Sequence, residues 1–430
     1  MGSVYNEIFN EVNKLEIIDS HEHLPHREEA REKNIDVLQE YLGHYMDSSL
    51  VSAGLSQAQL EMVKDHGRPI LERWRIAEPY WDFSRHTGYG RALDISVKAI
   101  YDIEQINGNT IEQLNEAFQK TLNPGHYKKV LKDLSKIKIS INDASNLDYD
   151  PAFFRATLRM DEFIFPRSID DFHLVAHETG ISICSFEDWL EACEAYLDYA
   201  FAHGAVALKC SLAYERPLSF ERVTKGEAEA CFNRIFRTIH YPQWELVPIE
   251  LGKTFQDYML HYILRLANQR HLTFQFHTGL QEGNGNYISN SNPELLSNLF
   301  LEYPNVDFDV FHIGYPYQHV MSALAKTFPN VYIDMCWAHI VSPAACIQAL
   351  GEWLESVPYD KIIAFGGDYK LVDGVYGHQY LARMDVSRTL AMKVEEGLFG
   401  IEEAINIARR LFYDNPLKLF KLEYQSSPSL

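Results

Sequence analysis

The chain has 430 residues, of which 46% are apolar and 23% charged, so it can bury a large core and global disorder is excluded. Its 39 basic and 60 acidic residues give a net charge of −21, which disfavours binding to nucleic acids and to anionic membranes. No stretch of the sequence is apolar for long enough to predict a transmembrane helix. We therefore expect a globular protein without nucleic-acid or membrane partners.

The N-terminal segment MGSVYNEIFNEVNKLEIIDS has neither the basic nor the apolar region of a secretory signal. None of the six cysteines forms a CxxC pair or a zinc-knuckle spacing. Six cysteines in a chain of this length are typical of reduced thiols, most of them packed in the core. These features predict a cytoplasmic protein.

Short apolar runs predict eight strands, each followed by polar residues. In chain order, the runs are residues 15–19, 137–141, 154–159, 205–208, 272–276, 306–311, 331–333 and 361–365, of which 154–159 is the weakest. Helical patterns lie between several of them, at 186–203, 255–269, 292–302, 319–328, 343–356 and 375–396.

Strands that alternate with helices predict βαβ units and a parallel sheet. About eight such strands favour an α/β fold of the (β/α)8 TIM-barrel type. An open doubly wound sheet is the alternative, but no GxGxxG turn follows the first strand. Residues 28–136 predict a mostly helical insertion after the first strand, and residues 211–250 a smaller one after the fourth. No linker divides the chain, so we expect residues 1–430 to form a single domain.

The first predicted strand runs into Asp-Ser-His-Glu-His, which ends at His23. Residues i and i+2 of an extended segment point to the same side, so His21 and His23 would project together into the mouth of a barrel. Two imidazoles arranged in this way can bind one metal ion. An HxH pair alone is a weak motif.

Four further strands deliver a potential ligand at their carboxyl ends. Lys209 ends the fourth run, His277 the fifth and His312 the sixth, and Asp368 follows the eighth. Histidines that merely pack in a core would not be expected to fall so regularly in register.

This order of residues resembles the amidohydrolase superfamily, in which HxH, Lys, His, His and Asp follow strands one, four, five, six and eight. The segments HEHLPHRE, FHTGLQEGNGN, FHIGYPY and FGGDY resemble the amidohydrolase-related branch, known as amidohydrolase 2, which includes uronate isomerase-like, decarboxylase-like and FluG/nodulin-like proteins. The resemblance spans residues 15 to about 422. It implies the fold and a metal centre, but it does not name a substrate.

The resemblance implies that His21, His23 and Asp368 bind the more buried metal ion. A carboxylated Lys209 would bridge to a second ion, which His277 and His312 complete. Zinc is the first choice because imidazole and carboxylate ligands suit it, with manganese, iron or nickel as alternatives. Asp368 would take a proton from the attacking water and pass it to the leaving group.

Two features of this centre stay open. Lys209 could be an unmodified lysine beside a single ion. His312 could hydrogen-bond to a water molecule instead of binding a metal ion, which would make it a catalytic residue. The leading hypothesis is a metal-dependent hydrolase that cleaves an amide, an ester or a lactone. The alternatives are an isomerase or lyase, such as a uronate isomerase or a decarboxylase, and a scaffold without catalysis.

Residues of the loops are candidates for binding a small polar substrate. Arg85 or Arg91 could pair with a substrate carboxylate, although a surface ion pair or a packing role is at least as plausible for either arginine. A role in the pocket is also expected for further residues that follow strands or lie in the first insertion: His26, Tyr89, Glu282, Trp337 and Tyr369. Homo-oligomers are common in such families, so a homo-oligomer is an open possibility here.

Overall fold

The computed structural model describes residues 2–144, 147–240 and 249–422. It contains one sheet of eight strands in which each strand pairs in parallel with the next along the chain. The strands are β1 (Ile17–Glu22), β2 (Ile137–Ala144), β3 (Phe154–Arg159), β4 (Ala205–Cys210), β5 (Thr273–Phe276), β6 (Asp307–Val310), β7 (Val331–Asp334) and β8 (Ile362–Ile363). With helices between the strands, this confirms the predicted (β/α)8 barrel.

Backbone hydrogen bonds join the two ends of the sheet. The amide of Ser20 donates to the carbonyl of Phe365 at 3.1 Å, and the amide of Asp368 donates to the carbonyl of His21 at 2.8 Å. Since β8 itself has only two residues, the segment that follows it provides most of this closure. The seam therefore runs directly through predicted metal ligands.

Strand burial explains the apolar runs of the sequence. Every residue of β4 and β5 is buried, because the inner face of each strand lines the barrel and the outer face is covered by helices. Polar side chains appear at the carboxyl ends, where the strands open into the mouth of the barrel.

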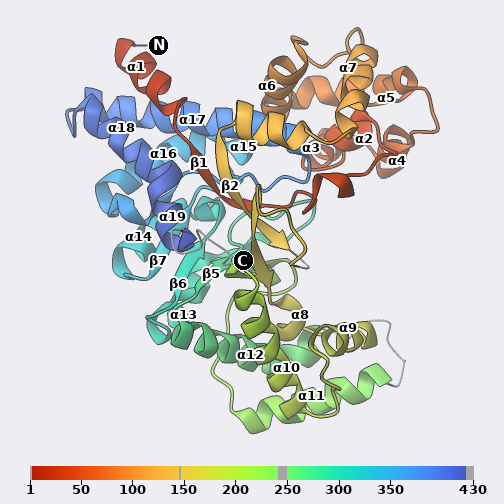
Figure 1. Ribbon diagram of the computed structural model, residues 1–430, viewed down its shortest axis with the longest axis vertical. Helices are drawn as coiled ribbons and strands as arrows, with labels where there is room; N and C mark the ends of the chain where they lie inside the picture. Colours follow the sequence, from red (N-terminus) through yellow and green to blue (C-terminus); the bar gives the residue numbers. More distant parts are fainter. Residues whose placement is uncertain (1, 145–146, 241–248, 423–430) are drawn as a thin grey trace.

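Between β1 and β2 the chain forms a group of helices that lies together at the upper right of Figure 1. They are α2 (Val37–Tyr41), α3 (Met46–Ser52), α4 (Gln57–Lys64), α5 (Ile70–Ser84), α6 (Gly88–Tyr101) and α7 (Ile111–Gln119). A π-helical turn (Lys128–Leu134) then leads into β2.

A second group of helices follows β3 and β4 and lies at the bottom of Figure 1. These are α8 (Asp161–Ile164), α9 (Ile169–Thr179), α10 (Phe186–Ala202), α11 (Lys225–His240) and α12 (Ile249–Arg270). Part of the predicted second insertion, residues 241–248, lies outside the described residues.

The remaining helices lie at the N-terminus and after β5: α1 (Ser3–Val12), α13 (Ser297–Glu302), α14 (Gln318–Thr327), α15 (Ala338–Val341), α16 (Pro343–Ser356), α17 (Val372–Glu395), α18 (Ile401–Arg409) and α19 (Asn415–Leu419). The long helix α17 packs against α1, α6, α16 and α18. It follows β8 closely, so it connects the barrel with the helices inserted after β1.

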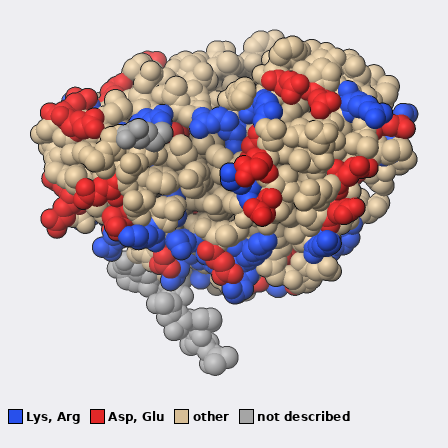
Figure 2. All heavy atoms as spheres, turned by 90° about the horizontal axis from the view of Figure 1, so that it is seen from above, with Lys and Arg blue, Asp and Glu red and all other residues tan. Residues whose placement is uncertain are grey.

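Acidic and basic side chains are interspersed over the face shown in Figure 2, despite the net charge of −21. Among the described residues, every helix is too short or too polar to cross a membrane.

Candidate metal centre

The carboxyl ends of β1 and β8 bring His21, His23 and Asp368 together. The Oδ1 atom of Asp368 lies 3.1 Å from Nε2 of His23 and 3.6 Å from Nε2 of His21. His21 is fully buried and Asp368 is 6% exposed. The spacing of the HxH pair thus places both imidazoles against one carboxylate, as expected for three ligands of one ion.

His21 provides a test of whether a cation fits here. Its side chain is fully buried, yet neither ring nitrogen has a hydrogen-bond partner among the described residues. An unpaired buried polar atom is costly, so such atoms are usually satisfied by a group that binds there. Burial lowers the pKa of His21 well below its ordinary value, so the ring is neutral and its lone pair is available to a metal ion.

His277 and His312 form a second pair of imidazoles. Nδ1 of His277 lies 3.0 Å from Nε2 of His312. The outer nitrogen of each ring donates to a backbone carbonyl, His277 to that of Leu280 at 2.9 Å and His312 to that of Cys336 at 2.9 Å. A carbonyl oxygen can only accept, so both facing nitrogens are left as acceptors.

Two lone pairs that face each other need a cation between them. Burial lowers the pKa of His312 to about 4 and that of His277 well below its ordinary value, so neither ring carries a second proton near neutral pH. A metal ion fits this arrangement because it accepts both lone pairs at once. The residues therefore suit the metal centre that the sequence predicted.

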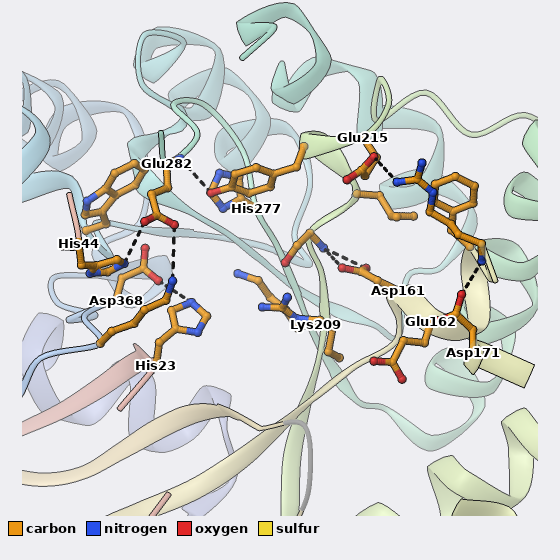
Figure 3. Close-up of a pocket in the computed structure, with 18 of the residues that line it drawn as sticks. His23, His44, Asp161, Glu162, Asp171, Lys209, Glu215, His277, Glu282 and Asp368 are labelled. Carbon is orange, nitrogen blue, oxygen red and sulfur yellow. Dashed lines mark hydrogen bonds and ion pairs between the residues drawn. The ribbon is translucent and has the colours of Figure 1, made fainter. Parts of the chain in front are cut away.

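Lys209 lies on β4, between the two ends of the cavity drawn in Figure 3. Its side chain is buried, and its Nζ atom lies 3.7 Å from the centre of the Phe311 ring. Burial lowers the pKa of Lys209 and outweighs the nearby carboxylates of Asp143 and Asp368, which act in the opposite direction. A larger share of Lys209 is therefore in the neutral amine form than in an exposed lysine, and carbamate formation requires that form.

Asp143 is a potential ligand that the sequence prediction missed. Its Oδ2 atom lies 3.9 Å from Nε2 of His21 and 3.8 Å from Nδ1 of His23. Burial raises the pKa of the Asp143 carboxyl, but Arg159, His23 and Lys209 together outweigh burial and hold the pKa below its ordinary value. The signal was present, because Asp143 follows the apolar run of the second strand, which extends beyond the predicted end at residue 141.

The backbone is strained around this centre. Five residues other than glycine adopt positive φ there: Tyr45 (62°), His312 (65°), Ile313 (49°), Trp337 (61°) and Asp368 (57°). Each such residue costs on the order of 1–3 kcal/mol and persists only where the surrounding packing demands it. Strain of this kind gathers at functional sites, which supports the assignment.

A cavity of about 670 Å³ opens above the centre. Figure 3 shows its two ends, with Lys209 between them. His23, His44, Glu282 and Asp368 lie at one end, and Asp161, Glu162, Asp171 and Glu215 lie at the other. The size suits a small molecule, and the two ends differ in chemistry, because the first combines carboxylates with imidazoles and the second combines carboxylates with Arg167, which pairs with Glu215 at 3.2 Å.

Four of the seven residues predicted to bind substrate line the main cavity or a cavity that adjoins it. Glu282 and Trp337 line the main cavity. Tyr89 stacks on Trp337 with the ring centres 6.4 Å apart and lines a smaller adjoining cavity. His26 lines another adjoining cavity, next to His23.

Three predicted residues do not line these cavities. Arg85 is held by Asp94 at 3.3 Å and Gln105 at 2.8 Å within the inserted helices. Arg91 is partly buried on α6. Tyr369 is buried, and its backbone amide donates to Glu22, so it supports the strand ends from behind.

Other basic residues line the cavity in place of Arg85 and Arg91. Arg159 at the end of β3, Arg167 before α9 and Lys370 after β8 line the main cavity. His44 and Tyr45 reach it from the inserted helices, and the Tyr45 hydroxyl donates to the Asp368 carbonyl. Arg159 follows its strand in the same way as the predicted ligands, so strand position could have found it, whereas nothing in the local sequence marks His44 or Tyr45.

The amidohydrolase family matches residues 169–422, which is more than half of the chain. Among solved structures, a uronate isomerase from Thermotoga maritima is similar at a TM-score of 0.81 and 18% identity, with 98% of each chain covered. A protein described as a metal-dependent hydrolase from Lactobacillus casei ATCC 334 is similar at a TM-score of 0.67 and 18% identity, covering 98% of this chain and 99% of that one. These structural similarities support the fold.

A curated relative, Protein fluG of Emericella nidulans, is 27% identical over 226 residues. The match covers 51% of this chain and 26% of the relative, so the two share only part of their lengths. The family match, the order of ligands along the barrel and the converging imidazoles agree, and we conclude that this chain belongs to the amidohydrolase family.

Proposed function

We propose that the protein is a metal-dependent hydrolase that cleaves an amide, ester or lactone bond in a small polar molecule. The observation that carries this proposal is the pair of acceptor nitrogens on His277 and His312, 3.0 Å apart, beside the cluster of His21, His23 and Asp368. Zinc is the proposed metal, because imidazole and carboxylate ligands suit it. A carboxylated Lys209 would allow two ions.

Bound at these residues, the metal would polarise the scissile carbonyl and lower the pKa of a water molecule towards 7. Asp368 faces His21 and His23 with Oδ1, which leaves Oδ2 to accept the proton of the attacking water and deliver it to the leaving group. Trp337 and Tyr45 stack at 4.9 Å and shield this end of the cavity from bulk water.

Arg159 is the proposed anchor for a negatively charged group of the substrate. Its Nε and Nη2 atoms both bond to Asp143, which fixes the plane of the guanidinium. Its Nη1 atom has no partner among the described residues, and the side chain is 41% exposed in the cavity. Asp143 therefore orients Arg159 so that one edge of its fork remains free for a carboxylate.

A uronate isomerase or decarboxylase activity is the second candidate, because the similarity to the Thermotoga maritima isomerase extends over nearly the whole chain. The presence of Lys209 among the converging side chains favours hydrolysis in our proposal. The two activities differ in their use of water, since hydrolysis incorporates a water oxygen into the product and isomerisation does not.

The test is a screen of amides, lactones and uronates with metal-reconstituted enzyme in water labelled with heavy oxygen. Labelled product supports hydrolysis, and an unlabelled isomer would reject it. Asp368→Asn should abolish turnover while metal analysis still finds bound metal. Asp414→Asn, which changes a carboxylate of the last helices that pairs with Arg409, should retain full activity. Full activity of Asp368→Asn would reject the role of proton carrier.

A further inference from the structure

Cys336 is a buried thiol beside the metal centre for which the proposed reaction has no use. It follows β7 and is fully buried. One ligand atom each from Cys336, His312 and Asp368 lie within 4.8 Å of one another. In a tetrahedral site with metal bonds of about 2.0–2.3 Å, the ligand atoms lie about 3.5 Å from each other. These three donor atoms could therefore bind one ion after shifts of about an ångström.

The thiol points into the barrel. A Cβ atom placed on Gly366 would lie 2.7 Å from Sγ of Cys336 and 2.5 Å from Oγ of Ser20, so the sulfur lies close against the seam between β1 and β8. Glycine at position 366 is what leaves room for the sulfur. The sulfur is therefore on the inner side of the residues that meet at the mouth.

The backbone of Cys336 also prepares its neighbour for metal binding. Its carbonyl accepts the Nδ1 proton of His312 at 2.9 Å, which fixes the tautomer that leaves Nε2 as an acceptor. Its own amide donates to Oδ1 of Asp334 at 2.7 Å, and this bond fixes the backbone of Cys336 relative to the end of β7. One residue thus orients a histidine ligand and presents a sulfur next to it.

We propose that Cys336 is a thiolate ligand of a second metal ion, which it holds together with His312 and with one oxygen of Asp368; this oxygen serves both ions, so that the other oxygen remains the proton acceptor. As the metal–sulfur bond forms, the thiol proton passes to water, so a divalent ion is matched by one thiolate and one carboxylate. The proposal rests on the proposed metal centre, because Asp368 belongs to both. A sulfur ligand selects zinc, cobalt or cadmium over magnesium or calcium.

With Cys336 as a ligand, the binding of a second ion would not require carboxylation of Lys209. In the proposed centre a carbamate on Lys209 would supply the negative charge for that ion, and the thiolate of Cys336 supplies it without carbon dioxide. Lys209 can then remain an amine in the same cavity, where its nearest aromatic neighbour is Phe311.

The experiment is a titration of metal-free full-length protein with cobalt(II), followed by absorption spectroscopy. Visible ligand-field bands report any cobalt bound by imidazole and carboxylate, whereas a near-ultraviolet charge-transfer band reports a cobalt–thiolate bond. The wild-type protein should show both, with the charge-transfer band growing as the second equivalent binds. Cys336→Ser should keep the visible bands and lose the charge-transfer band.

Cys346→Ser is the matched control, since Cys346 is equally buried but lies on α16, outside the cluster of His312, Cys336 and Asp368. It should give the wild-type spectrum. In Cys336→Ser the second equivalent should bind at least about tenfold more weakly, because even residues that only support ligands are worth about 10–100-fold in metal affinity.

The outcomes separate the two proposals. Visible bands without a charge-transfer band in the wild-type protein would overturn the thiolate ligand and leave the proposed function standing. An absence of cobalt binding would overturn both. A charge-transfer band that persists in Cys336→Ser would come from another cysteine and would also overturn the thiolate ligand; Cys336→Ala replaces Cys336→Ser if the latter does not fold.

Discussion

A buried carboxylate helps to hold the inserted helices on the barrel, and breaking one of its hydrogen bonds should loosen them measurably. Asp373, at the start of α17, is 2% exposed. It accepts hydrogen bonds from the hydroxyls of Tyr41 and Tyr101, each at 2.6 Å, and lies 2.5 Å from Nε2 of His126. All three partners come from the segment between β1 and β2, which also carries Tyr45 over the metal centre.

Tyr41→Phe removes one of these bonds and leaves the carboxylate with its two other partners. A hydrogen bond to a charged group contributes about 1.5–3 kcal/mol. Tyr41 is 2% exposed, so water cannot readily replace its hydroxyl. At tenfold per 1.4 kcal/mol, the inserted helices should open about 10- to 150-fold more often.

Hydrogen–deuterium exchange of the backbone amides in α2 and α6 measures this opening directly. Tyr80→Phe is the matched control, because its hydroxyl lies in the same group of helices and, within the described part of the chain, has only a long contact of 3.5 Å with Gln59. It should leave exchange in α2 and α6 within about twofold of wild type. Equal exchange in Tyr41→Phe and wild type would show that Asp373 does not hold the helices on the barrel.

Three further predictions concern the metal centre and the barrel interior. Removing the metal with a chelator should lower the thermal unfolding midpoint, and metal at 100 times its Kd should restore about 2.7 kcal/mol; an unchanged midpoint would contradict metal binding by the folded state. Arg159→Lys should raise KM for a carboxylated substrate about 10- to 150-fold, the worth of a charge-assisted hydrogen bond, and leave KM for an uncharged analogue unchanged; equal effects on both substrates would remove Arg159 as the anchor. Asp309 and Asp334 are buried neighbours. Oδ1 of Asp309 and Oδ2 of Asp334 have no hydrogen-bond partner among the described residues, and burial raises the pKa of both carboxyls. Since these folded pKa values exceed the unfolded value of about 3.9, the folded state binds more protons and its free energy of unfolding falls as the pH rises above about 4. In metal-free Asp309→Asn this fall between about pH 5 and about pH 8 should be smaller than in wild type, as measured by urea unfolding, and an equal slope would contradict the raised pKa of Asp309.

The barrel and the convergence of its ligands could be predicted because both follow from local patterns. A strand buried on both faces is a short apolar run, and the residue after it must lie at the mouth of a parallel barrel. His277, His312 and Asp368 each follow such a run, so their meeting did not depend on any detail of packing. Asp143 obeys the same rule, but the second strand extends three residues further than its apolar run suggests.

The walls of the cavity could not be predicted in the same way. Tyr45 reaches Asp368 because it adopts a φ of 62° and because Asp373 holds the surrounding helices in place. Both causes involve residues far away in the chain. Arg85, in contrast, looked like a pocket residue in the sequence, but Asp94 and Gln105 bind it inside the insertion.

The candidate metal centre lies beside the shortest strand of the barrel. β8 has two residues, and the bond from the Asp368 amide to the His21 carbonyl joins the two edges of the sheet at two predicted ligands. An ion bound to His21, His23 and Asp368 would therefore cross-link β1 to the segment after β8, in addition to serving the reaction. The stabilisation by metal should then be concentrated at this seam, so that chelation increases amide exchange at residues 20–23 and 365–369 far more than in β4 or β5. Uniform loss of protection across all eight strands would show that the ion acts on the barrel as a whole.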